Sequence, residues 1–150
     1  LPNDSRIQID HLGGAMTAFY QKAALKEQRI NPRYRWLGER THSQTRRHIA
    51  QSHLLVLTSK MEGGANVVSE ACVAGTPILT TRIDGSIGLL GADRPGMFGA
   101  GETRSLSQLR LRCENDPHFY ERLRRISIRK SNLFIPRRER ENLRKLLRGL

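Results

Sequence analysis

Cysteines and long hydrophobic runs are both scarce in this sequence. Its two cysteines, Cys72 and Cys113, lie too far apart for a metal-binding pair and are too few for a disulfide framework. The apolar run at residues 54–57 is far shorter than the roughly 20 residues of a membrane-spanning helix. The first ten residues include charged ones and lack the apolar core of a secretory signal. We therefore expect no membrane span and a location in the reducing cytoplasm.

Patterns that would hold a metal ion are also missing. The sequence contains no Asp-x-Asp motif, and its histidines show no metal-ligand spacing with one another or with the cysteines. A structural or exposed role is therefore expected for each histidine. The five are His11, His42, His48, His53 and His118. We expect no metal ion and no cofactor.

Acidic residues are too few to balance the basic ones. The chain has 26 Lys and Arg against 14 Asp and Glu, a formal charge of +12. Residues 121–150 carry 11 of the basic and three of the acidic residues, so +8 of this charge lies in a basic C-terminal tail. Such a tail attracts phosphates, nucleic acid or an acidic protein surface. Only 5% of the residues are aromatic, which favours a solvated basic helix over stacking on bases, and nucleic-acid binding remains the alternative.

What the sequence does contain is an alternation of strand and helix patterns. We predict strands over residues 7–12, 34–37, 53–57 and 77–81, and helices over 15–29, 43–52 and 66–74, the last ending at Gly75. The glycine-rich residues 82–102 predict a loop, and helices follow over 105–115, 117–130 and 136–147. The apolar strand at 53–57 is typical of a parallel sheet covered on both faces. The order predicts an α/β fold with a Rossmann-like doubly wound parallel sheet and a helical C-terminal end.

Residues 59–81 form the segment that indicates chemistry. A buried strand is followed by Gly63 and Gly64, and a helix opens near Asn66. This order places the backbone N–H groups of Gly64, Ala65, Asn66 and Val67 at the start of a helix. Such N–H groups bind phosphate through unpaired donors and the positive end of the helix dipole. Glycine lets a ligand approach the backbone closely.

Two glutamates flank this turn. Glu62 precedes it, and Glu70 follows one turn inside the helix. A carboxylate at Glu70 can accept two hydrogen bonds from a ribose diol, and Glu62 can meet the hydroxyls of a sugar beyond a diphosphate. From the residues alone, an ordinary turn with two solvated glutamates is an equally good interpretation.

The run "MEGGANVVSEACVAGTPIL" resembles the nucleotide-sugar site of group 1 (family 4-type) glycosyltransferases, in which two glutamates are separated by seven residues. The segments "RYRWLGER", "RIDGSIGLLG" and "ENDPHFYERL" extend the resemblance over nearly the whole chain. The resemblance implies that Glu62 is the catalytic candidate, which would orient the donor sugar. It assigns donor binding to Gly63, Gly64, Ala65, Asn66, Val67 and Glu70.

A narrower resemblance concerns the substrates. The segments "RYRWLGER", "EGGANVVSEA" and "GLLGADRPGMFGAGET" are similar to the selenosugar synthases of selenoneine biosynthesis. This resemblance implies hexosyl or N-acetylhexosaminyl transfer from a UDP-linked sugar, with selenophosphate as the acceptor.

The family resemblance also implies a domain organisation. Its members are two-domain GT-B-type enzymes, and residues 1–150 resemble the second, donor-binding domain without its first strand and helix. We therefore expect the N-terminal domain of the same enzyme as a partner, and no sugar transfer by this chain alone. The predicted helix at 136–147, with Leu143, Leu146 and Leu147, could also drive formation of a homo-oligomer.

Overall fold

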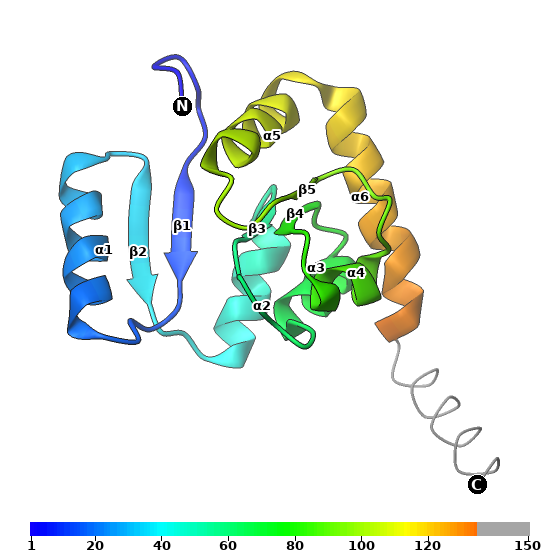
Figure 1. Cartoon of the computed structure of the whole chain (residues 1–150), viewed down its shortest axis with the longest axis horizontal. Helices are drawn as coiled ribbons and strands as arrows, with labels where there is room; N and C mark the ends of the chain where they lie inside the picture. The colour runs from blue at the N-terminus through cyan, green and yellow to red at the C-terminus, as the bar shows by residue number, and fades with distance from the viewer. Residues whose placement is uncertain (135–150) are drawn as a thin grey trace, which may run out of the picture. The chain divides into compact units, whose positions relative to one another are not determined.

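The computed structural model describes residues 1–134, which divide into two compact units. The first unit comprises Leu1–Arg47, and the second begins at His48. The boundary falls inside helix α2 (His42–Gln51). Figure 1 traces the elements of both units in chain order.

The first unit is a strand–helix–strand motif. Strands β1 (Ile9–Leu12) and β2 (Tyr34–Gly38) pair in parallel, with Ile9 opposite Tyr34. Helix α1 (Ala18–Ile30) connects them and packs against β2. It begins three residues later than predicted, because the Thr17 side chain caps it by accepting a hydrogen bond from the Tyr20 backbone N–H.

The second unit is built on a three-stranded parallel sheet. Its order is β3 (Leu55–Leu57), β4 (Ile78–Thr81) and β5 (Met97–Phe98). Leu55 lies opposite Ile78, and Thr80 lies opposite Met97. All four residues of the central strand β4 are buried, as expected where helices cover both faces of a sheet.

Four helices accompany this sheet: α3 (Asn66–Ala74), α4 (Asp84–Leu90), α5 (Thr103–Asn115) and α6 (Pro117–Ser131). A short 3₁₀ helix, η1 (Asn132–Phe134), follows α6. Helix α3 begins and ends at the predicted residues, and Gly75 ends it in the left-handed conformation with φ +72°.

The prediction of a loop over residues 82–102 was wrong in two places. These residues contain α4 and the two-residue strand β5. The three-residue spacing of isoleucine and leucine at Ile87 and Leu90 is helical, but the neighbouring glycines hide this pattern. Burial of Ser86 and Leu90 stabilises α4 despite its glycines, so tertiary packing outweighs helix propensity.

The core lies on both faces of β4. Because side chains alternate along a strand, Ile78 and Leu79 point to opposite faces and belong to different clusters. The Ile78 cluster contains Val68, Ala71 and Cys72 of α3 with Ile49 and Leu90, and the Leu79 cluster contains Phe98, Phe119 and Leu123. Helices therefore cover both faces of the parallel sheet, which confirms the predicted α/β fold class.

The predicted helix over residues 136–147, with its three leucines, lies outside the described residues. Within residues 1–134, no helix combines the length and the apolar character needed to cross a membrane.

Candidate functional site

The candidate site lies at the edge of the sheet where β3 and β4 end. Because the two strands are parallel, the loops that follow them leave the sheet at the same edge. The loop after β3 contains Glu62, Gly63 and Gly64 and leads into α3, whereas β4 leads within three residues into α4. Ligands of doubly wound folds bind at this edge.

The first turn of α3 is open at the backbone. Ala65 precedes the helix, and no side chain caps it there. The early N–H groups, including those of Asn66 and Val67, have no acceptor within an α-helix. Gly63 and Gly64 are exposed, and a Cβ at Gly63 would meet nothing within 4 Å. The arrangement offers backbone donors and the positive end of a helix dipole to a phosphate.

The side chains of this turn face two ways. Ala65 and Val67 are half-buried and pack against the Ile78 cluster of the core. Asn66 is exposed, and Glu70 lies four residues further along the same face of α3 and is half-buried. The predicted residues from Glu62 to Glu70 thus form one continuous loop-and-helix segment, and their roles stay predictions.

Glu62 is held by a neighbour in its own loop. The Ser59 hydroxyl donates a hydrogen bond to Oε1 of Glu62. The carbonyl oxygen of Ser59 accepts a second bond from the Thr81 hydroxyl, at 2.6 Å between the two oxygens. A chain of hydrogen bonds therefore connects the end of β4 to the carboxylate of Glu62.

The first turn of α4 packs closely against the loop that carries Glu62. A Cβ built on Gly85 would lie 2.1 Å from the carbonyl oxygen of Glu62 and 3.0 Å from the nitrogen of Gly64. Only glycine fits at this position without moving the loop. Further along α4, the Leu89 side chain lies 3.9 Å from a Cβ built on Gly64.

Sequence reasoning missed Ser59, Thr81 and Gly85. A hydroxyl three residues before a glutamate is a signal that could have pointed to Ser59. Gly85 gave no such signal, because its close approach to Glu62 arises only when α4 packs beside the loop.

Residues 1–134 contain no group of three or more His, Cys, Asp or Glu side chains placed to hold a metal ion. The expectation of a metal-free site stays a prediction.

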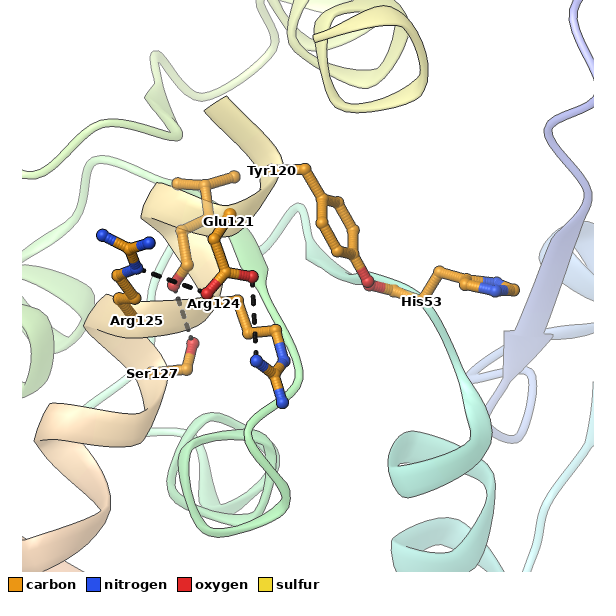
Figure 2. Close-up of polar contacts among 7 residues, drawn as sticks. His53, Tyr120, Glu121, Arg124, Arg125 and Ser127 are labelled. Carbon is orange, nitrogen blue, oxygen red and sulfur yellow. Dashed lines mark hydrogen bonds and ion pairs between the residues drawn. The ribbon is translucent and has the colours of Figure 1, made fainter. Parts of the chain in front are cut away.

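Two of the arginines of α6 form ion pairs with a glutamate of the same helix. Figure 2 shows Glu121 between two arginines, with 3.7 Å to Arg124 and 3.3 Å to Arg125. The Tyr120 hydroxyl donates to the carbonyl oxygen of His53 at 2.9 Å, and Phe119 is buried. Because both aromatic residues of α6 take part in the fold, neither offers a free platform for a nucleic-acid base.

Comparison with known proteins gives one family and several similar structures. The sequence model of the family "Glycosyl transferases group 1" matches residues 11–130. No curated protein sequence gives a significant match.

The solved proteins that share the fold include HepE and AviGT4. HepE (Alr3699) of Anabaena, solved in complex with UDP and glucose, aligns with a TM-score of 0.78 and 18% identity over 97% of this chain. AviGT4, a glycosyltransferase involved in avilamycin A biosynthesis, aligns with a TM-score of 0.63 and 23% identity over 95% of this chain. The chain spans only 41% of the HepE structure and 44% of the AviGT4 structure.

Proposed function

This chain belongs to the group 1 glycosyltransferases, and we propose that it binds the nucleotide-sugar donor of such an enzyme, a UDP-linked sugar. The observation that carries the proposal is the uncapped N-terminus of α3, reached through the exposed Gly63 and Gly64 at the edge where β3 and β4 end. HepE, which has the same fold, was solved with UDP and glucose and also with UDP-glucose.

The chemistry of sugar transfer explains why a helix N-terminus is useful there. Breaking the bond between the anomeric carbon and the diphosphate leaves positive charge on the sugar and adds negative charge to the diphosphate. Fixed backbone donors stabilise such charge without having to reorganise, and losing one donor of this kind costs roughly 3–4 kcal/mol. We assign this role to the N–H groups of Gly64, Ala65, Asn66 and Val67.

We assign the two glutamates to the hydroxyl groups at the two ends of the donor. Glu62, in the loop beside the turn, orients the hydroxyls of the donor sugar. Glu70, on the same helix face as Asn66, accepts hydrogen bonds from the ribose diol. Both residues are half-buried, so each is partly shielded from water. Oε2 of Glu70 is buried in this structure, so its other oxygen, Oε1, is the one assigned to the ribose.

The transferred sugar, the acceptor, the partners and the location are proposed from the sequence. Hexosyl or N-acetylhexosaminyl transfer to selenophosphate is proposed from the resemblance of three segments to selenosugar synthases. The remaining part of a two-domain enzyme is the proposed partner in transfer, and a homo-oligomer through residues 136–147 is a further proposal. A cytoplasmic location is proposed because both cysteines are free thiols.

Titration of the isotopically labelled chain with UDP, followed by NMR, tests the site. The amide signals of residues 62–70 are expected to shift most, because their N–H groups surround the phosphates. If other amides shift and these do not, the proposed site is wrong.

A variant of Glu70 separates donor binding from nucleic-acid binding. Glu70→Ala is expected to abolish UDP binding, because the ribose loses its acceptor, and to leave any affinity for DNA unchanged. Calorimetry with UDP and fluorescence anisotropy with labelled DNA measure the two. DNA binding that is tight in a chain that does not bind UDP would favour the alternative function.

A further inference from the structure

Three residues outside the predicted site hold the loop that carries Glu62. Ser59 bonds to the Glu62 carboxylate, Thr81 bonds to the Ser59 backbone, and Gly85 packs against the Glu62 carbonyl. We infer that Ser59, Thr81 and Gly85 are positioning residues that aim the Glu62 carboxylate at the donor sugar. This inference rests on the proposed function, because it takes Glu62 to face the sugar.

Ser59 determines which carboxylate oxygen meets a ligand. Its hydroxyl donates to Oε1 of Glu62. A hydrogen bond from a hydroxyl to an ionised carboxylate is stronger than one between neutral groups, so it restricts the rotation of a side chain on a loop. Oε2 then remains as the acceptor for a sugar hydroxyl.

Thr81 connects this arrangement to the buried central strand of the sheet. It is the last residue of β4 and is fully buried, and its hydroxyl bonds to the Ser59 carbonyl oxygen at 2.6 Å. Side chains that act on substrate need support from buried residues on regular elements, because loops alone are too loosely held. β4 supplies that support through Thr81 and Ser59.

Gly85 limits the position of the Glu62 backbone from the other side. The 2.1 Å between a Cβ built on Gly85 and the Glu62 carbonyl oxygen is far below any van der Waals contact, and the neighbouring group is backbone. An alanine there must displace the loop. Gly85 lies within α4 and has no positive φ, so the substitution acts through this contact and not through backbone strain.

The consequence is selectivity for the sugar part of the donor. Glu62 is assigned to the sugar, whereas the backbone of α3 is assigned to the phosphates. A disturbed Glu62 should therefore weaken the binding of a UDP-sugar more than the binding of UDP.

Calorimetry on the 150-residue chain with UDP and with UDP-glucose tests this expectation. Ser59→Ala should weaken UDP-glucose binding about tenfold, the usual effect of losing one hydrogen bond to a charged group, and leave UDP binding as in the wild type. Gly85→Ala should weaken UDP-glucose binding at least as much, and it should weaken UDP binding too, because its Cβ would lie 3.0 Å from the Gly64 nitrogen that is assigned to the phosphates. Ser59→Thr keeps the hydroxyl and should restore the wild-type ratio of the two affinities.

Gly88→Ala is the matched control for Gly85→Ala. It makes the same substitution in the same helix, at a position where a Cβ would meet nothing within 4 Å. Both affinities should remain those of the wild type. If Gly85→Ala fails to fold, the Ser59→Ala and Ser59→Thr pair decides the matter, because removing one hydroxyl leaves the packing intact.

A double substitution shows whether Ser59 acts through Glu62. Once Glu62→Ala has removed the carboxylate, adding Ser59→Ala should weaken UDP-glucose binding no further. Additive losses, or an equal loss of UDP and UDP-glucose affinity in Ser59→Ala, would overturn the inference and leave the proposed function standing. A wild-type chain that binds neither ligand would contradict the proposed function itself.

Discussion

At the scale of single residues, burial shifts the pKa values of two core side chains, Cys72 and Arg94. Cys72 of α3 has no exposed surface, and burial raises the pKa of its thiol to about 11. Arg94 is also buried, and loss of hydration lowers the pKa of its guanidinium to about 10. Arg94 donates to the carbonyl oxygen of Ile78 at 2.6 Å and to that of Pro95 at 3.1 Å, so it joins β4 to the segment before β5.

The thiol of Cys72 should be almost unreactive in the folded chain. A pKa of about 11 instead of 9.0 leaves about a hundred times less thiolate near neutral pH, and the thiolate is the reactive form. Labelling with a thiol reagent, read by mass spectrometry, should modify Cys72 only after urea is added. Rapid labelling of Cys72 without urea would show that α3 opens readily.

The contribution of Cys72 to stability should fall between about pH 9 and pH 11. In this window the unfolded chain releases the Cys72 proton, and the folded chain keeps it because of the raised pKa. The stabilising effect is complete below pH 9 and is lost as the pH rises toward the folded value. Cys113, whose pKa burial also raises to about 11, contributes in the same direction. Urea unfolding at several pH values should show a shallower fall for Cys72→Ala than for the wild type.

At the scale of elements, α3 joins the core to the site. Its buried residues Val68, Ala71 and Cys72 anchor it on β4, and its N-terminus faces the edge where β3 and β4 end. Its C-terminus is fixed by Gly75, whose N–H bonds to the carbonyl oxygen of Cys72 at 3.1 Å. The direction of the helix dipole at the site therefore depends on contacts at the far end of the helix.

Replacing the glycine at the end of α3 should destabilise the chain. At φ +72° a side chain is strained, and a Cβ at Gly75 would lie 3.3 Å from Cγ1 of Ile128 in α6. We expect Gly75→Ala to lower the free energy of unfolding by about 1–2 kcal/mol, measured by urea denaturation. Gly88→Ala should be neutral or stabilising, because alanine favours helix by roughly 0.8–1.0 kcal/mol over glycine. Equal effects of the two substitutions would contradict this account.

At the scale of the whole molecule, the chain covers less than half the length of the solved proteins that share its fold. It spans 41% of the HepE structure and 44% of the AviGT4 structure, and its proposed site holds a donor. Aligning donor and acceptor can supply about 7–11 kcal/mol of a reaction barrier, and that alignment needs groups that face the donor.

Residues 1–150 alone should therefore bind UDP-glucose without transferring glucose at a measurable rate. An assay of UDP release with a range of acceptors measures this. When the chain is joined to the N-terminal domain that is proposed as its partner, transfer should appear. Glu62→Ala or Glu70→Ala should then reduce it severely. Robust transfer by residues 1–150 alone would show that the N-terminal domain is not required.

Local patterns in the sequence were sufficient for the class of the fold and for α3. The apolar run at 53–57, the glycine pair at Gly63 and Gly64, and Gly75 at a helix end each act over a few residues. For that reason the alternation of strands and helices, and both ends of α3, could be predicted. The pair of glutamates indicated the group 1 glycosyltransferases by resemblance, and the family match confirms that family. The donor site itself stays a prediction.

Tertiary structure alone decided the parts that depend on distant contacts. Helix α4 forms in a glycine-rich stretch because burial of Ser86 and Leu90 outweighs weak helix propensity. Thr81 reaches the Ser59 backbone, and Gly85 reaches Glu62, only because parallel strands bring two loops to one edge of the sheet. Such contacts join residues more than twenty positions apart, so no local pattern in the sequence could have indicated them.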